Sequence, residues 1–270
     1  MEQLPLLGMG TWGMGGTFEK DTRNDDESII ALRSGINLGI TLIDTAEFYG
    51  AGHTEELIAE AIQPYPRESI KIISKVWKTN LHYDAVLDAA ERSLARLKTD
   101  YIDLYMIHWP SDEVPLDETM SAMERLVNEG KVRTIGVSNF STELIEEAQR
   151  SLINTRLTAN QIEYNLTNQN EQYATIPYCK QYGLQVIAYR PFAKGSLTRV
   201  KSDMILRISE KYNKTPNQIA LNWLISQDII AIPKASSLEH MKENAGSLGW
   251  ALSKEDIDLL RTAFSSKTFP

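Results

Sequence analysis

Cysteine, basic charge and long apolar runs are all scarce in this sequence. Cys179 is the single cysteine among 270 residues, so no disulfide forms within the chain, and we expect a reducing compartment such as the cytoplasm. The first residues lack the basic and apolar segments of a signal peptide. No apolar run approaches the roughly 18 residues that a membrane helix needs, so no membrane partner is expected. The net charge of −8 argues against nucleic acid as a partner.

A nucleotide-binding glycine fingerprint and an internal linker are also missing. No G-x-G-x-x-G motif follows a predicted strand, because Gly10, Gly13, Gly15 and Gly16 have a different spacing and no helix pattern begins there. No low-complexity segment or change in composition marks a domain boundary. With 42% apolar and 24% charged residues, the composition is typical of a globular protein. We predict a single domain over residues 1–270.

Short apolar runs alternate with helix-period segments along the chain. Eight strands are predicted, at residues 6–11, 42–44, 70–74, 102–107, 134–137, 158–162, 184–188 and 229–232. Helices are predicted near residues 29–36, 55–62, 86–97, 116–129, 144–152, 172–182, 204–212 and 238–248. Thr215 and Gln218 form a predicted capping box, and Ser253 opens an additional C-terminal helix. Eight such units indicate a (β/α)8 TIM barrel, with an open doubly wound sheet as the alternative.

Polar side chains mark the ends of three of these strands. Asp44 ends one strand, Lys75 directly follows the next, and His108 follows the one after it. Tyr49 lies in the loop that begins after Asp44. Because the carboxyl ends of all barrel strands face one opening, we expect these four side chains to meet there.

The four side chains together suit general acid catalysis. A free tyrosine has a pKa of about 10 and is a poor proton donor at neutral pH. An ammonium group from Lys75 would lower that pKa, while the Asp44 carboxylate would keep the lysine charged. His108 would hydrogen-bond a substrate oxygen. Such a set protonates an oxygen that gains negative charge, as in nucleophilic addition to a carbonyl, and hydride is one candidate nucleophile.

Each residue alone also has an ordinary structural interpretation. Asp44 fits a turn or helix cap, and Lys75 fits a solvated strand end. His108 fits a core histidine, and Tyr49 fits an aromatic lid over a pocket. Their gathering at one opening favours the catalytic interpretation.

Seven segments, in order from residue 8 to residue 234, match one family. They are GMGTW (8–12), GITLIDTA (39–46) with YG (49–50), SKVW (74–77), DLYMIHWP (103–110), GKVRTIGVSNF (130–140), NQIEY (160–164) and IPK (232–234). On these segments the chain resembles the aldo-keto reductases over nearly its whole length. The resemblance implies a (β/α)8 barrel that reduces aldehydes and ketones with NADPH or, less often, NADH.

The resemblance also assigns roles to the four polar residues. It makes Tyr49 the proton donor and Lys75 the group that lowers the tyrosine pKa. Asp44 would pair with Lys75, and His108 would orient the carbonyl. The substrate wall would comprise Trp12, Tyr49, Trp77, His108 and Trp109.

For the cofactor, the resemblance assigns Ser138, Asn139 and Gln161 to the nicotinamide carboxamide, which needs both donors and acceptors. Tyr189 would stack on the nicotinamide ring. The remaining expected cofactor residues are Thr11, Trp12, Arg190, Pro191, Phe192, Lys234, Ala235, Ser236, His240, Glu243 and Asn244. No metal ligand set is expected.

Three departures from the family pattern bear on the site. Arg190 follows Tyr189 where the family often has serine; contact with the pyrophosphate and a solvated position both remain open. The short N-terminus puts in question the hairpin that plugs the bottom of the barrel. Only residues 265–270 follow the last helix, which predicts an open pocket with broad carbonyl specificity.

His240 occupies the position where the family usually has an arginine that grips the 2′-phosphate of NADPH. Histidine is a weaker and mostly neutral donor, although Lys234, Ser236 and the helix start at Ser237 favour an anion. We predict that NADPH is preferred and that NADH is usable. The alternative is that His240 is a solvated helix residue.

Two other functional classes compete with a monomeric reductase. A Schiff-base aldolase would use Lys75 as its nucleophile, but pairing with Asp44 keeps that lysine protonated. A non-catalytic, nicotinamide-binding regulatory relative needs no complete set of polar residues, whereas this sequence keeps all four.

Overall fold

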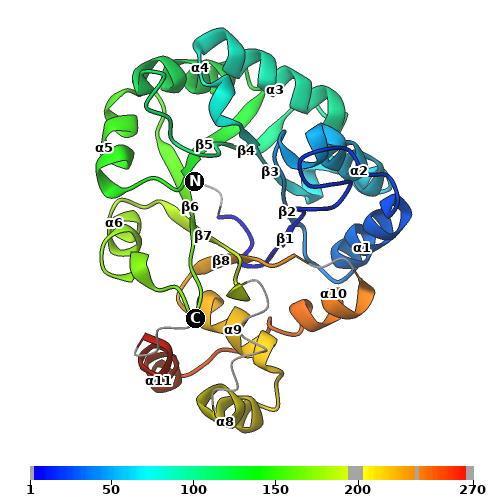
Figure 1. The fold of residues 1–270 in the computed structure, drawn as a ribbon, viewed down its shortest axis with the longest axis vertical. Coiled ribbons are helices and arrows are strands. Elements are labelled where there is room, and N and C mark those ends of the chain that lie inside the picture. Colours follow the sequence, from blue (N-terminus) through cyan, green and yellow to red (C-terminus); the bar gives the residue numbers. More distant parts are fainter. Residues whose placement is uncertain (1–2, 194–202, 235–236, 266–270) are drawn as a thin grey trace.

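The computed structural model describes residues 3–193, 203–234 and 237–265. Eight parallel strands pair in the order β1 to β8, and Figure 1 shows them as an inner ring surrounded by helices. The strands are β1 (Gly8–Gly10), β2 (Leu42–Asp44), β3 (Lys71–Val76), β4 (Ile102–Ile107), β5 (Val132–Ser138), β6 (Leu157–Glu163), β7 (Gln185–Tyr189) and β8 (Ile229–Ile232).

The ring closes between its first and last strands. The Gly10 N–H donates to the Pro233 carbonyl at 3.0 Å, and the Ala231 N–H donates to the Leu6 carbonyl at 2.9 Å. A Cβ atom on Gly10 would lie 2.8 Å from the Ile232 carbonyl oxygen, so only glycine permits this approach. The closure confirms the predicted barrel and excludes the open sheet.

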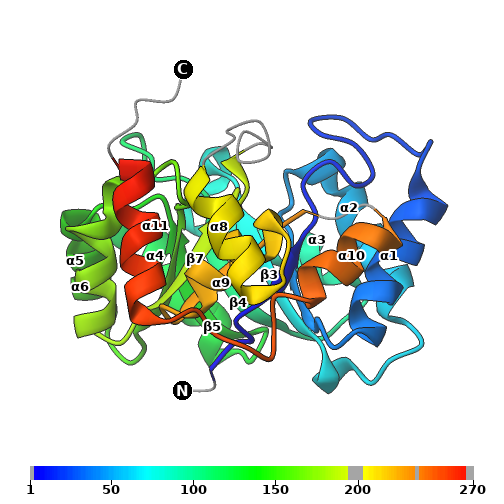
Figure 2. The same cartoon turned by 90° about the horizontal axis from the view of Figure 1, so that it is seen from below.

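The helices cover the outside of the barrel. They are α1 (Asp25–Asn37), α2 (His53–Ile62), α3 (Tyr83–Leu97), α4 (Leu116–Asn128), α5 (Thr142–Arg150), α6 (Thr175–Gln181), α8 (Asp203–Tyr212), α9 (Pro216–Ile225), α10 (Leu238–Ala245) and α11 (Lys254–Ser265). Short 3-10 helices are η1 (Tyr49–Gly52), η2 (Arg67–Ser69), η3 (Lys78–Asn80) and η4 (Asn170–Gln172). The additional C-terminal helix is α11, which packs on α8 along the flank seen in Figure 2. Among the described residues, no helix is long and apolar enough to cross a membrane.

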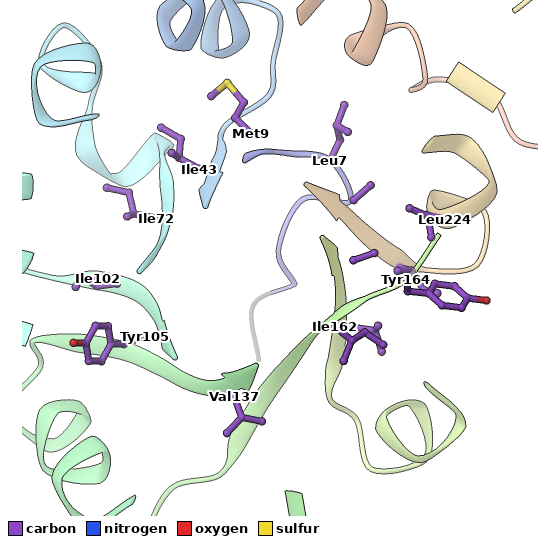
Figure 3. Packing of buried hydrophobic residues seen from close by; sticks show 14 of the residues in the cluster. Leu7, Met9, Ile43, Ile72, Ile102, Tyr105, Val137, Ile162, Tyr164 and Leu224 are labelled. Atoms are coloured by element: carbon purple, nitrogen blue, oxygen red, sulfur yellow. The ribbon is translucent and has the colours of Figure 1, made fainter. Parts of the chain in front are cut away.

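Two apolar layers hold the strands. The larger layer lies between strands and helices, where side chains such as Met9, Ile43 and Val137 point outward from the ring (Figure 3). A smaller cluster fills the barrel itself with alternate residues of the strands, among them Ile73 and Leu104. Burial on both faces explains why the strands are continuous apolar runs in the sequence.

The bottom of the barrel is covered without a hairpin. Within residues 3–7, only Leu7 makes a strand-like bridge. Leu4 and Leu6 instead pack against the interior cluster, and the Leu4 N–H donates to the Gln185 side chain at 2.8 Å. In the part of the chain that the structure describes, residues 3–7 thus form no hairpin at this end of the barrel.

Several predicted boundaries shift by a few residues. Strand β3 continues to Val76, so Lys75 is part of the strand rather than the residue after it. Helix α10 ends at Ala245 with Gly246 as its cap, short of the predicted residue 248. The predicted capping box at Thr215 is present, and the Ser141 side chain caps α5.

We expect Thr215→Ala to lower the free energy of unfolding by about 1 kcal/mol. The Thr215 hydroxyl accepts from the Gln218 N–H at 3.2 Å, and the Gln218 side chain accepts from the Thr215 N–H at 3.0 Å. Urea unfolding with an unchanged m-value measures the loss. Ser141→Ala is the control with the weaker cap, since its bond to the Leu144 N–H spans 3.4 Å. Equal midpoints for Thr215→Ala and wild type would contradict the assigned cap.

Candidate active site

The structure brings the four predicted polar residues together at the carboxyl end of the barrel. Asp44 is the last residue of β2, and Lys75 lies near the end of β3. His108 directly follows β4, and Tyr49 begins η1 in the loop after β2. All four side chains are buried. Adjacent pairing of β2, β3 and β4 explains why residues far apart in sequence meet here.

A buried ion pair forms the base of this group. Lys75 Nζ lies 2.8 Å from Asp44 Oδ1 and donates to the Thr45 carbonyl at 2.8 Å. The third N–H of the Lys75 ammonium points to the Tyr49 hydroxyl oxygen, and this Nζ–O distance of 3.5 Å is at the long limit of a hydrogen bond. Gln161 Nε2 also donates to Asp44 Oδ1, at 2.7 Å. An ammonium has three donors, so Lys75 has none to spare.

Burial, rather than the ammonium of Lys75, dominates the pKa of Tyr49 in this geometry. Burial raises the pKa of the Tyr49 hydroxyl well above its usual 10, and the Asp44 charge raises it further. Lys75 Nζ lies 2.8 Å from Asp44 Oδ1 and 3.5 Å from the Tyr49 hydroxyl oxygen. The net change in the Tyr49 pKa is upward despite this ammonium. Burial likewise lowers the pKa of Lys75, and Asp44 opposes that change. Tyr49 therefore holds its proton firmly.

His108 is a neutral imidazole in this structure. Burial, followed by the nearby positive charge of Lys75, lowers its pKa to about 2. Its ring meets those of Tyr49 and Trp77 edge-on, with centroids 5.6 Å and 5.1 Å away. Its buried Nδ1 has no hydrogen-bond partner in the described part of the chain. A neutral imidazole both donates and accepts, so His108 suits hydrogen bonding to a carbonyl oxygen.

The predicted carboxamide residues form one connected group. The Asn139 side-chain amide donates to the His108 carbonyl at 3.2 Å and to the Ser138 hydroxyl at 2.9 Å. The Tyr189 hydroxyl donates to Asn139 Oδ1 at 2.8 Å. The Ser138 hydroxyl in turn donates to the Gln161 carbonyl at 3.1 Å. Asn139 has a φ of 63°, a strained conformation that these bonds hold in place.

These groups face a cavity of about 730 Å³. Most predicted site residues line it, namely Thr11, Trp12, Asp44, Tyr49, Trp77, His108, Trp109, Ser138, Asn139, Gln161, Tyr189, Arg190, Pro191, Phe192 and Lys234. Lys75 lies behind this lining, in contact with Asp44.

Sequence reasoning missed two aromatic residues of the cavity, Phe18 and Phe48. Phe48 stacks on Trp77 with centroids 3.8 Å apart and lies nearly parallel to Trp12 at 6.5 Å. Phe18 meets both Trp12 and Phe48 edge-on. The position of Phe48 directly before Tyr49 was a usable signal. Phe18 had none, because its loop has no periodic pattern.

Three predicted cofactor residues on α10, His240, Glu243 and Asn244, lie outside the cavity lining. His240 is an exposed residue of α10 whose N–H donates to the Ser237 side chain at 3.3 Å. Asn244 is buried on the same helix. The Glu243 carboxylate accepts from the Thr215 hydroxyl at 2.7 Å and from the Asn217 side chain at 3.2 Å, so it also holds α9. Ala235 and Ser236 fall outside the described residues.

Arg190 lines the cavity but is already paired. Its guanidinium lies 2.8 Å from the Glu163 carboxylate and 5.7 Å from the centre of the Tyr189 ring. Its φ is 52°. The side chain is half exposed, so an anion at the rim of the cavity could contact it alongside Glu163.

The match to the aldo/keto reductase family model spans residues 6–264. This chain belongs to the aldo/keto reductase family. It is 37% identical to the methylglyoxal reductase YeaE of Escherichia coli over 97% of this chain and 91% of that protein. Family members therefore share the whole barrel with this chain rather than one motif.

Solved structures of the family have the same fold. A thermostable aldo-keto reductase bound to the inhibitor epalrestat superposes with a TM-score of 0.93 at 41% identity, covering 96% of this chain and 95% of that one. An aldo-keto reductase from Klebsiella pneumoniae in complex with NADPH gives 0.89 at 38% identity, covering 98% and 93%. As an aldo-keto reductase, this protein is an oxidoreductase that reduces carbonyl compounds.

We expect Asp44→Asn to move the alkaline limb of kcat/KM for carbonyl reduction to lower pH. The negative charge of Asp44 raises the pKa of both Tyr49 and Lys75. Without it, either group loses its proton at lower pH, and a general acid without its proton is inactive. Initial rates across the alkaline range measure the shift. Asp112→Asn, at an exposed rim position, serves as the control, and an unmoved limb in Asp44→Asn would contradict the electrostatic assignment.

Proposed function

We propose that this protein reduces aldehydes and ketones to alcohols with NADPH, and that Tyr49 supplies the proton. The observation that carries the proposal is the buried Tyr49 hydroxyl at the cavity, close to the Lys75–Asp44 pair and the edge of His108. The family membership, a methylglyoxal reductase relative and a relative in complex with NADPH support it.

The residues at the cavity fit a nicotinamide cofactor, which supplies hydride to the carbonyl carbon when bound. Ser138, Asn139 and Gln161 offer hydroxyl and amide groups suited to the carboxamide, and the Tyr189 ring offers a stacking face. At the other end, Lys234 lines the cavity, and Ser237 begins α10 with its N-terminus available for an anion. Both ends of an anionic dinucleotide thus have matching groups.

Each polar residue has a role in moving the proton. Tyr49 retains its proton because burial raises its pKa, and it releases that proton only to an oxygen that gains negative charge. His108 stays neutral and donates a hydrogen bond to the same oxygen. Lys75, held by Asp44 and Thr45, stabilises the phenolate that remains on Tyr49.

The walls favour apolar carbonyl compounds of varied shape. Trp12, Phe48 and Trp77 give broad ring faces with few directional contacts, and hydrophobic walls discriminate weakly between substrates, by about 1–3 kcal/mol per methylene. We therefore propose broad specificity that includes small dicarbonyls of the kind named for the methylglyoxal and glyoxal reductase relatives.

A Schiff-base aldolase fits these contacts poorly. Lys75 is fully buried, and its ammonium is directed at Asp44, Thr45 and Tyr49. Attack on a carbonyl requires a neutral amine that reaches the cavity. A non-catalytic, nicotinamide-binding regulatory protein would not need the polar group that Lys75, Asp44 and His108 form around Tyr49.

We extend the proposal to the whole chain as one domain that acts as a monomer in the cytoplasm. The pairing from β1 through β8 joins residue 8 to residue 232 in one barrel. Cys179, the single cysteine, is free and buried, which suits a reducing compartment.

We expect Tyr49→Phe to lower kcat for carbonyl reduction by about 10²–10⁴-fold while NADPH binding stays near wild type. Loss of NADPH absorbance with 4-nitrobenzaldehyde measures the rate, and quenching of tryptophan fluorescence measures binding. Lys75→Met should have a comparable effect, with a smaller one for Asp44→Asn. Retention of more than about a tenth of kcat in Tyr49→Phe would exclude it as the general acid.

We expect His240→Arg to raise the preference for NADPH over NADH by about tenfold in kcat/KM, because arginine forms a charged, bidentate contact with phosphate. His240 lies in the first turn of α10, after Ser237. The control, Leu248→Arg, adds the same charge at an exposed position beyond the end of that helix. An unchanged ratio in His240→Arg would show that residue 240 lies away from the 2′-phosphate.

A further inference from the structure

A second buried histidine lies just beyond the turn that carries Tyr49. His53 is the first residue of α2 and is 8% exposed. Its Nδ1 lies 2.7 Å from the Glu56 carboxylate, and its Nε2 lies 2.8 Å from the carboxylate of Asp25 at the start of α1. Ionised carboxylates only accept hydrogen bonds, so both ring nitrogens must donate. Only the imidazolium form does that.

The loop formed by residues 11–24 crosses directly over this histidine. A Cβ atom on Gly15 would lie 2.9 Å from His53 Cδ2, and a Cβ atom on Gly50 would lie 2.4 Å from the Gly15 carbonyl oxygen. The loop therefore rests on both the histidine ring and the Tyr49 turn. Glycine at both positions makes this approach sterically feasible.

Other contacts fasten the same loop to the same turn. The Gly50 N–H donates to the Thr17 carbonyl at 2.9 Å, and the Thr54 hydroxyl donates to the Met14 carbonyl at 2.6 Å. This loop carries Trp12 and Phe18, which line the cavity. Displacement of the loop would therefore move part of the aromatic wall, while the strands that carry Asp44, Lys75 and His108 stay in place.

The charges around His53 come from several elements. Asp25 reaches it from α1, and Glu56 reaches it from its own helix. Lys20 of the loop pairs with Glu56 at 3.1 Å. The Arg96 guanidinium of α3 approaches the neighbouring Gly52, but Glu55 holds it at 2.7 Å. The hydrogen bond from His53 lowers the pKa of Glu56, in keeping with an ionised carboxylate there.

We propose that His53 is a positioning residue whose imidazolium ties α1 to α2 and so holds the loop of residues 11–24, with Trp12 and Phe18, in the shape that binds the carbonyl substrate. The expected change in KM rests on the proposed reductase activity. The two contacts of His53 with Asp25 and Glu56, which we call the clamp, do not depend on that activity. Only the charged ring makes both bonds, to Asp25 and to Glu56.

The first experiment compares His53→Gln with the matched variant His82→Gln. His82 also pairs with a glutamate, Glu118 at 3.1 Å, but it is 65% exposed and belongs to the α3–α4 side of the barrel. We expect His53→Gln to raise KM for the carbonyl by about five- to tenfold with kcat within about twofold of wild type. His82→Gln should match wild type in both constants.

Hydrogen exchange gives a readout that needs no activity. In His53→Gln, exchange in residues 11–24 and at the Gly50 amide should become faster, while the β4 and β5 amides stay protected. If the wild-type protein reduces no carbonyl compound but loop exchange changes as expected in His53→Gln, the proposed reductase function is wrong. The proposed structural role of His53 would then still hold.

Three results would overturn the proposal. They are unchanged KM and loop exchange in a folded His53→Gln protein, a fall confined to kcat, or equal effects in His82→Gln. If His53→Gln does not fold, Asp25→Asn removes one carboxylate while it keeps the side-chain shape. The same rise in KM and in loop exchange is expected from Asp25→Asn, and wild-type behaviour of that variant would overturn the clamp.

Discussion

The site depends on one buried ion pair, Lys75 with Asp44. Removing two charges from water is costly, and a close pair offsets that cost only when its other hydrogen-bonding positions are filled. Here the Thr45 carbonyl and the Tyr49 hydroxyl take the remaining lysine donors, and Gln161 bonds the carboxylate. These contacts come from β2, β3, β6 and the loop after β2, so the barrel must close before the pair is satisfied. The chemistry and the fold are therefore linked at this point.

The pair also determines how the proposed acid behaves. An isolated lysine would favour the phenolate form of Tyr49, but burial and then the negative charge of Asp44 raise the pKa of this tyrosine. The tyrosine thus keeps its proton at rest, and the ammonium matters most once the proton has left and negative charge lies on the ring oxygen. Stabilisation that develops with the transition state accelerates a reaction more than stabilisation of the resting enzyme. The resting geometry is consistent with a proton held until the carbonyl oxygen requires it.

The strand pattern and the polar strand ends were predictable because both follow from simple rules. Fully buried parallel strands read as apolar runs, and their carboxyl ends meet at one opening. The direction of the Tyr49 pKa shift was not predictable, because it depends first on how deeply the hydroxyl is buried and then on the distances to charges such as Asp44. Phe18 was missed for a related reason, since its loop is shaped by contacts with Gly50 and His53 that no local pattern reveals.

The polar residues and the aromatic residues at the cavity are held in place by different parts of the structure. The polar residues around Lys75 sit on strands or directly beside them, where neighbouring backbone bonds fix their positions. Trp12 and Phe18 sit on a loop held by side-chain and turn contacts around His53. Rigid elements hold reacting groups more accurately than loops do, whereas loops tolerate changes in sequence that reshape a wall. The strands thus hold Asp44 and Lys75, whereas a loop carries Trp12 and Phe18, so this part of the aromatic wall can change its fit to substrates while the Lys75–Asp44 pair remains undisturbed.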